Sequence, residues 1–176
     1  MLKAHNRHAV HDTDLCQWLL SLGADPNRAP ELEDVTPLSL AVSYGTSSVI
    51  STMFENKGDP LKGQLMHNVV HRKGCDQSEI IDLLLHWGVP VDESYQEGLS
   101  NRHRTRLLPD MLGTPLHWAI DYNQVHTVEH LLLRGADPSK TNGWGRSAFQ
   151  LAEQRGIPEV IAVLQRFSTD RSTATT

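Results

Sequence analysis

A short pattern that recurs along the chain constrains its fold more than any other feature. The clearest copy is Thr114-Pro115-Leu116-His117, which is followed by Trp118 and Ala119. A second pattern, Leu-Leu followed by Gly, Asp and Pro, alternates with the first. Weaker copies of the first pattern begin at Thr36, Gln64 and Ser147, and copies of the second span residues 19–27, 53–60, 84–92 and 132–138. Two patterns in alternation predict one structural unit repeated along the chain.

The residue types of the two patterns suit the ends of helices. A threonine hydroxyl caps free backbone amides at a helix start, and proline fits the first helical turn, where its missing N–H costs nothing. Leucine and alanine then fall on one helical face. Glycine adopts the left-handed conformation that ends a helix, and Asp-Pro turns the chain. The unit is therefore a pair of helices whose apolar face a neighbouring unit must cover.

The first pattern resembles the Thr-Pro-Leu-His-x-Ala signature of the ankyrin repeat, and the resemblance covers residues 12–167. It implies an all-α ankyrin-repeat solenoid of stacked helix-turn-helix units with short or irregular β-hairpin loops. It also implies a non-catalytic protein-protein interaction module that binds its partner on the concave groove. His67 and His117 occupy the signature histidine, which is structural in the family, and Asn27 resembles asparagines that are hydroxylated there.

The positions of the copies divide the chain into repeats. Helices are expected at residues 12–22, 65–72, 78–87, 115–122, 125–134, 148–155 and 158–167, with residues 2–10 as the first helix of the first repeat. The predicted segments are a partial or capping repeat at 1–28, repeats at 29–61, 62–91 and 113–140, an inserted loop at 92–112, a C-terminal capping repeat at 141–168 and a disordered tail at 169–176. The partial first repeat has two interpretations: a degenerate N-terminal capping repeat, or a fragment of a longer array.

The spacing between the repeats is irregular. The loop from Gly58 to Gln64 is short, and the one from Gly88 to Thr114 is long, a pattern similar to ankyrin arrays of filamentous fungi. The long loop carries a basic cluster that consists of Arg102, Arg104 and Arg106, with His103 among them. This cluster could dock an acidic peptide or a phosphate, or it could be a solvated excursion.

The resemblance also predicts where a partner would bind. In the family, two positions at the end of each first helix point into the groove. Here they are Ser43, Tyr44, His71, Arg72, Asp121, Tyr122, Gln154 and Arg155, and Trp144 and Arg146 lie on the last hairpin tip. Tyr, Trp and Arg are enriched in binding hot spots, which favours a groove that is used. The alternative is a solvated surface that tolerates any residue.

Composition narrows the partners. The formal net charge of −5 provides no general attraction to nucleic acid or anionic membrane, and no apolar run approaches the ~18 residues of a membrane span. The two cysteines, Cys16 and Cys75, are expected to be buried thiols, which fits an intracellular, reducing compartment. Ten histidines form no structural zinc pattern. We therefore expect a monomer without cofactor or metal.

Two other functions remain open. His71, Arg72, Asp121 and Tyr122 could form an acid–base set in a small-molecule-binding or catalytic array. Against this, the chain has no Gly-rich phosphate loop, nucleophile elbow or zinc-helix motif. The chain could also be a structural segment of a larger multidomain protein.

Overall fold

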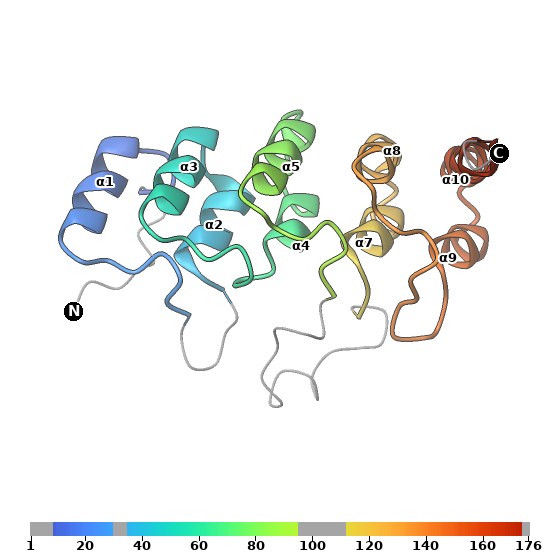
Figure 1. The fold of residues 1–176 in the computed structure, drawn as a ribbon, viewed down its shortest axis with the longest axis horizontal. Coiled ribbons are helices and arrows are strands. Elements are labelled where there is room, and N and C mark those ends of the chain that lie inside the picture. Colours follow the sequence, from blue (N-terminus) through green and yellow to red (C-terminus); the bar gives the residue numbers. More distant parts are fainter. Residues whose placement is uncertain (1–8, 30–34, 95–111, 174–176) are drawn as a thin grey trace. The chain divides into compact units, whose positions relative to one another are not determined.

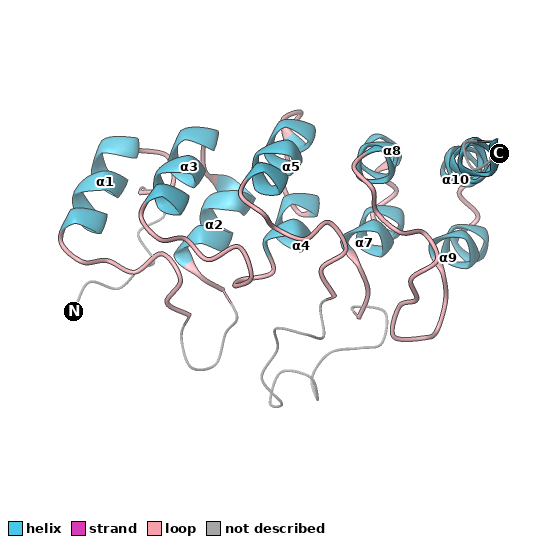
Figure 2. Cartoon of the chain, in the orientation of Figure 1, coloured by secondary structure: helices cyan, strands magenta, loops and turns pink. Residues whose placement is uncertain are grey.

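The computed structural model describes residues 9–29, 35–94 and 112–173, and helices dominate these ranges (Figures 1 and 2). The one β-type pairing in this part of the chain is an isolated bridge between Thr141 and Ser147. Contacts divide the chain into two units. Of the described residues, those up to Pro90 belong to the first unit and those from Val91 on belong to the second. The predicted all-α fold of paired helices is confirmed for the described residues.

The first unit stacks its helices in two layers. Its helices are α1 (Thr13–Ser21), α2 (Pro37–Tyr44), α3 (Ser47–Glu55), α4 (Leu65–Val70) and α5 (Gln77–His86). Helix α2 packs against α3 and α4, while α3 also packs against α1 and α5, so that α1, α3 and α5 form one row and α2 and α4 the other (Figure 1). The largest fully buried side chains between the rows are Leu38, Ile50, Leu65, Met66, Ile80, Ile81 and Leu84.

The second unit repeats this arrangement. Its helices are α7 (Pro115–Asp121), α8 (Val125–Leu133), α9 (Ala148–Arg155) and α10 (Pro158–Thr173). Helix α7 packs against α8 and α9, and α10 packs against the same two helices. The fully buried large residues here are Leu116, Ile120, Leu131, Leu151 and Leu164.

Three copies of the first pattern begin their helices with the same reciprocal hydrogen bonds. The Thr36 hydroxyl accepts from the Ser39 amide at 3.0 Å, and the Ser39 hydroxyl accepts from the Thr36 amide at 2.8 Å. Thr114 and Ser147 make equivalent capping boxes with the third residue of their helices. The fourth copy departs from this, because Gln64 has φ 52° and does not cap α4 with its side chain. The threonine hydroxyl therefore caps a backbone amide at Thr36, whereas the Thr114 hydroxyl bonds the His117 ring nitrogen at 2.9 Å.

Side chains in the loops tie successive repeats together. The Asn27 amide donates to the Lys57 carbonyl at 2.7 Å and accepts from the Asp59 amide at 2.7 Å. In the second unit the Asp92 carboxylate accepts from the Asp137 amide at 3.1 Å. Asp59 and Asp137 both begin an Asp-Pro turn, so the two bonds repeat one connection. Both polar ends of the Asn27 amide are thus engaged; its hydroxylation stays a prediction.

Several sequence-based expectations need correction. Cys16 is buried as expected, whereas Cys75 is exposed because it lies in the turn before α5. Trp18, an aromatic residue of α1, is 55 % exposed. Helix α10 continues to Thr173, where a disordered tail was expected from residue 169 on. Hydroxyls of Ser168 and Thr169 stabilise this end by donating to the carbonyls one turn earlier. Residues 2–8 of the expected first helix lie outside the described residues.

Candidate functional site

An open pocket in the first unit brings together four of the predicted groove residues. It has a volume of about 750 Å³ and lies where α2 and α4 end, beside the turn that leads into α5. The four residues that sequence reasoning assigned to the groove are Ser43, Tyr44, His71 and Arg72. The other lining residues are Asn68, Lys73, Gly74, Cys75 and Asp76.

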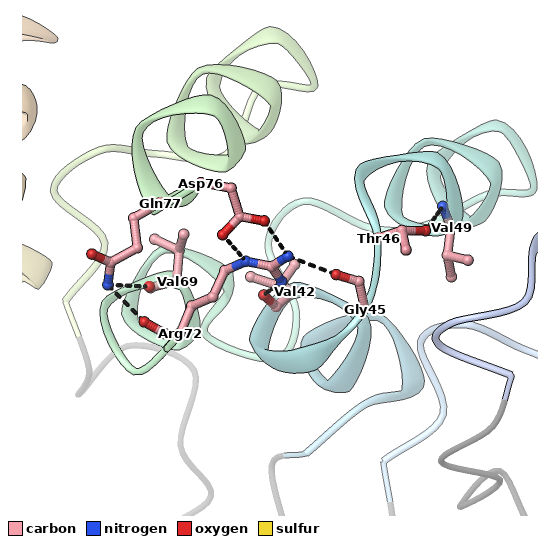
Figure 3. A network of polar contacts seen from close by, with 8 residues as sticks. All are labelled: Val42, Gly45, Thr46, Val49, Val69, Arg72, Asp76 and Gln77. Atoms are coloured by element: carbon pink, nitrogen blue, oxygen red, sulfur yellow. Dashed lines mark hydrogen bonds and ion pairs between the residues drawn. The ribbon is translucent and has the colours of Figure 1, made fainter. Parts of the chain in front are cut away.

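Arg72 is a structural tie in this pocket (Figure 3). Its guanidinium donates to both carboxylate oxygens of Asp76, at 2.8 and 2.5 Å. It also donates to the carbonyls of Val42 at 2.9 Å and Gly45 at 2.7 Å, at the end of α2. The Arg72 side chain is only 10 % exposed. The sequence predicted a binding anchor; in the structure four of its five N–H donors join α2 to the turn after α4.

The same contacts set the charge of Asp76 and close the end of α4. Hydrogen bonding from Arg72 holds the pKa of the Asp76 carboxyl below its ordinary value of 3.8. The Gln77 side-chain amide lies beside three carbonyls at the end of α4 and donates toward that of Arg72 at 3.0 Å (Figure 3). On the other wall, the Ser43 hydroxyl donates to Asn68 at 2.9 Å. The pocket walls are therefore held by contacts within the unit.

The remaining pocket residues present their side chains to solvent. Tyr44 is 64 % exposed. His71, Lys73 and Cys75 are exposed as well. Two effects lower the pKa of His71 below its ordinary value of 6.5. The larger is partial desolvation of its ring, and the smaller is charge repulsion from His67. His71 is therefore neutral at pH 7. A phenol, a neutral imidazole and an ammonium group thus surround the mouth of the pocket.

The lowered pKa of His71 predicts an acid-sensitive first unit. Because the folded state holds His71 with a pKa below 6.5, the unfolded chain binds the proton more readily, and acidification from pH 6.5 downward favours unfolding. We expect His71→Asn to reduce the loss of stability between about pH 6.5 and 5. Urea unfolding at a series of pH values measures this. At pH 8 His71 is neutral in both states, so the slope of stability with pH should be the same in the wild type and in His71→Asn. If the two proteins also lose stability equally between pH 6.5 and 5, the role assigned to His71 is wrong.

The hairpin tip before α9 holds a second set of predicted residues, in the second unit. The Asn142 side-chain oxygen accepts the backbone N–H groups of Trp144 at 3.0 Å and Arg146 at 3.1 Å. The His117 ring bonds the Arg146 carbonyl at 3.1 Å. Trp144 is 54 % exposed, and the Arg146 guanidinium carbon lies 5.9 Å from the centre of its ring. A fixed backbone thus presents an exposed aromatic ring with a cation beside it.

The other predicted residues of the second unit lie at the ends of α7 and α9. Arg155 donates to the Asp121 carboxylate at 2.7 Å, so these two charges satisfy each other. Tyr122 is 52 % exposed, and desolvation together with the Asp121 charge raises the pKa of its phenol above the ordinary value of 10.0. Tyr122 is therefore a neutral, exposed aromatic side chain at neutral pH.

One predicted cluster lies outside the described residues, and the sequence did not predict two features of the surface. The basic cluster, which consists of Arg102, Arg104 and Arg106, falls outside the described ranges. Sequence reasoning missed Lys73, because it considered only the last two positions of each first helix. It also missed an open pocket of about 570 Å³ between α3 and α5, lined mainly by hydroxyls and carboxylates: Ser47, Ser48, Ser51, Thr52, Glu55, Glu79 and Leu83.

Two further properties of the described residues concern metals and membranes. Within residues 9–29, 35–94 and 112–173, no three His, Cys, Asp or Glu side chains gather where they could hold a metal ion. In the same part of the chain, every helix is too short or too polar to cross a membrane. Of the four residues in the catalytic alternative, His71 and Arg72 belong to the first unit and Asp121 and Tyr122 to the second.

Comparison with known proteins gives the family of the repeats. Residues 113–143 match the family model described as Ankyrin repeat. Ankyrin repeat and SOCS box protein 5 of Oryctolagus cuniculus is 32 % identical over 92 residues, which are 52 % of this chain and 23 % of that protein. The nuclear factor NF-kappa-B p105 subunit of Rattus norvegicus is 41 % identical over 59 residues, 34 % of this chain and 6 % of that one. The palmitoyltransferase AKR1 of Lachancea kluyveri is 44 % identical over 75 residues, 42 % of this chain and 9 % of the transferase. The chain thus spans less than a quarter of the length of these relatives.

Proposed function

Because the chain is an ankyrin-repeat protein, we propose that it acts as a non-catalytic module that binds another protein through the ends of its first helices and the adjoining loops. Ankyrin repeats are generally protein-interaction modules, and the relatives are ankyrin proteins. The observation that carries the proposal is the exposure of aromatic side chains at groove positions: Tyr44 is 64 %, Tyr122 52 % and Trp144 54 % exposed. Tyrosine and tryptophan provide large contact area together with a polar group.

Rigid presentation explains how these side chains would give affinity. The backbone that carries Tyr44 is the last turn of α2, which Arg72 ties to the neighbouring repeat. The backbone that carries Trp144 is held by Asn142 and His117. Since the backbone at both positions is already ordered, binding would cost little conformational entropy, and more of the contact energy would appear as affinity.

The proposal assigns no catalysis, cofactor or metal to the chain. The matched part of the palmitoyltransferase is 9 % of that protein, so its activity is not transferred here. The partner is a protein or peptide, the module is a monomer, and its compartment is intracellular and reducing. Free thiols at Cys16 and Cys75 support the last point.

Capture from native cell extract tests the proposal. We expect Tyr44→Ala and Trp144→Ala each to weaken capture of the partner about tenfold or more, because removal of an aromatic hot spot costs about 2 kcal/mol or more. Both should leave helicity and melting unchanged. Trp18→Ala is the matched control, because Trp18 is equally exposed, at 55 %, but lies on α1 outside the proposed surfaces. Capture that survives both groove substitutions, or that fails equally with Trp18→Ala, would overturn the assignment.

A further inference from the structure

The turn between α4 and α5 presents unused hydrogen-bond donors at the mouth of the 750 Å³ pocket. Among the described residues, the backbone N–H groups of Lys73, Gly74 and Cys75 donate to no protein acceptor. The Lys73 ammonium makes no ion pair in this part of the chain. All three residues are exposed. The turn therefore offers three amide donors and one cation on a single short segment.

The charges around this turn leave a net positive pocket in an acidic chain. The Arg72 and Asp76 charges neutralise each other through two hydrogen bonds at 2.8 and 2.5 Å. His71 is neutral at pH 7, because its pKa lies below 6.5. Lys73 is thus the uncompensated charge among the lining residues, although the whole chain carries −5. An anionic group would find an attractive field here and a repulsive one over the chain as a whole.

We propose that this pocket takes the carboxylate side chain of an acidic peptide segment, with an apolar neighbour of that residue lying against Tyr44. The inference rests on the proposed function and names the chemistry of its partner. The carboxylate accepts from the Lys73 ammonium and from the N–H groups of the turn 73–75. Charge-assisted hydrogen bonds of this kind are about twice as strong as neutral ones.

The geometry of the turn favours this ligand. A Cβ atom at Gly74 would lie 2.8 Å from Asp76 Oδ1, so glycine lets the turn pass close to the neutralised Asp76–Arg72 pair. A phosphate group is the poorer occupant, because it carries a charge of about −1.5 to −2 at pH 7 and one lysine balances only a single charge. The Arg72 fork is already occupied by Asp76 and two carbonyls. One lysine with backbone amides suits a single carboxylate.

Amide chemical shifts in the full chain test the inference directly. The probe is the capped pentapeptide Glu-Glu-Phe-Glu-Glu, and the neutral comparison is Gln-Gln-Phe-Gln-Gln. We expect the glutamate peptide to shift the backbone amides of Lys73, Gly74 and Cys75, and the glutamine peptide to leave them in place. Added salt should weaken the response, because the contact is exposed and screened.

A matched pair of lysine substitutions completes the test. Lys73→Gln should weaken binding of the glutamate peptide about two- to fivefold, the range expected for an exposed ion pair. Lys57→Gln removes the same charge from an exposed site outside the pocket and should leave binding unchanged. Equal shifts with both peptides, shifts confined to other residues, or equal losses in both variants would overturn the inference. The proposed function would still stand if Tyr44 and Trp144 carry capture from extract, so the two failures are distinguishable.

Discussion

Replacement of Arg72 by alanine is expected to destabilise the first unit by about 2–4 kcal/mol, because it leaves buried acceptors without a donor. The guanidinium is the donor to the carbonyls of Val42 and Gly45 and to the carboxylate of Asp76. Its side chain is only 10 % exposed, so water replaces it poorly. Arg72→Lys should recover little of this loss, since one ammonium cannot reproduce a planar fork that reaches three groups.

Arg166→Ala is the matched control for this effect. Arg166 donates to Glu129 at 2.6 Å, which is within the 2.5–2.9 Å range of the four Arg72 bonds, but the Arg166 side chain is 62 % exposed. Surface pairs contribute about 0–1 kcal/mol, so this substitution should change stability little. Urea unfolding with amide hydrogen exchange in α2 and α4 measures the first unit separately. If Arg72→Ala costs no more than Arg166→Ala, the role of Arg72 as a tie between repeats is wrong.

Interactions between residues close in sequence were predictable, and the distant ones were not. The capping boxes at Thr36 and Thr114 join residues three apart, so a four-residue pattern contains both partners. Arg72 bonds Val42 and Gly45, which lie 30 and 27 residues earlier. Nothing in the residue type of Arg72 distinguishes an arginine that bonds within its own array from one that binds a partner, so these internal bonds could not be predicted from the sequence.

Burial of individual side chains was also only partly predictable. The apolar face of α5 was correctly located, but Cys75 lies outside it because the helix begins at Gln77. Trp18 follows the helical spacing of a core residue, yet it is exposed. Position on a helical face follows from spacing, whereas burial depends on what a neighbouring element covers. The same reasoning applies to the proposed binding residues: Tyr44 and Trp144 are exposed, and Lys73 was overlooked because it lies in a turn.

His117, the histidine of the clearest motif copy, is expected to stabilise the second unit as Arg72 stabilises the first. The Thr114 amide donates to His117 Nδ1 at 3.2 Å, and a backbone N–H can only donate. The ring therefore carries its proton on Nε2, which donates to the Arg146 carbonyl at 3.1 Å. His117 is 1 % exposed. One imidazole thus joins the start of α7 to the hairpin tip that carries Trp144.

His117→Ala should destabilise the second unit by about 2–4 kcal/mol, because it removes the bonds of the ring to Thr114 and to the Arg146 carbonyl and leaves a cavity. His117→Ser separates the cap from the bond to the tip, since Ser39 makes the same cap at the equivalent position of the Thr36 copy. The serine variant leaves nearly the same cavity and loses the bond to the tip but keeps the cap, so it should cost about 1 kcal/mol less than His117→Ala. Urea unfolding read by hydrogen exchange in α7 and α9 measures both, with the exposed His126→Ala as a control that should change stability by less than about 0.5 kcal/mol.

The serine variant also tests whether order at the hairpin tip matters for binding. If the fixed backbone of Trp144 contributes to affinity, His117→Ser should weaken partner capture although Trp144 itself is unchanged, because the loosened tip must be ordered on binding. Backbone order parameters of residues 143–146 should fall in the same variant. A drop in order without any loss of capture would show that Trp144 acts without preorganisation. Loss of capture with unchanged order parameters at residues 143–146 would instead place His117 itself in the binding surface. That result would disagree with its exposure of only 1 %.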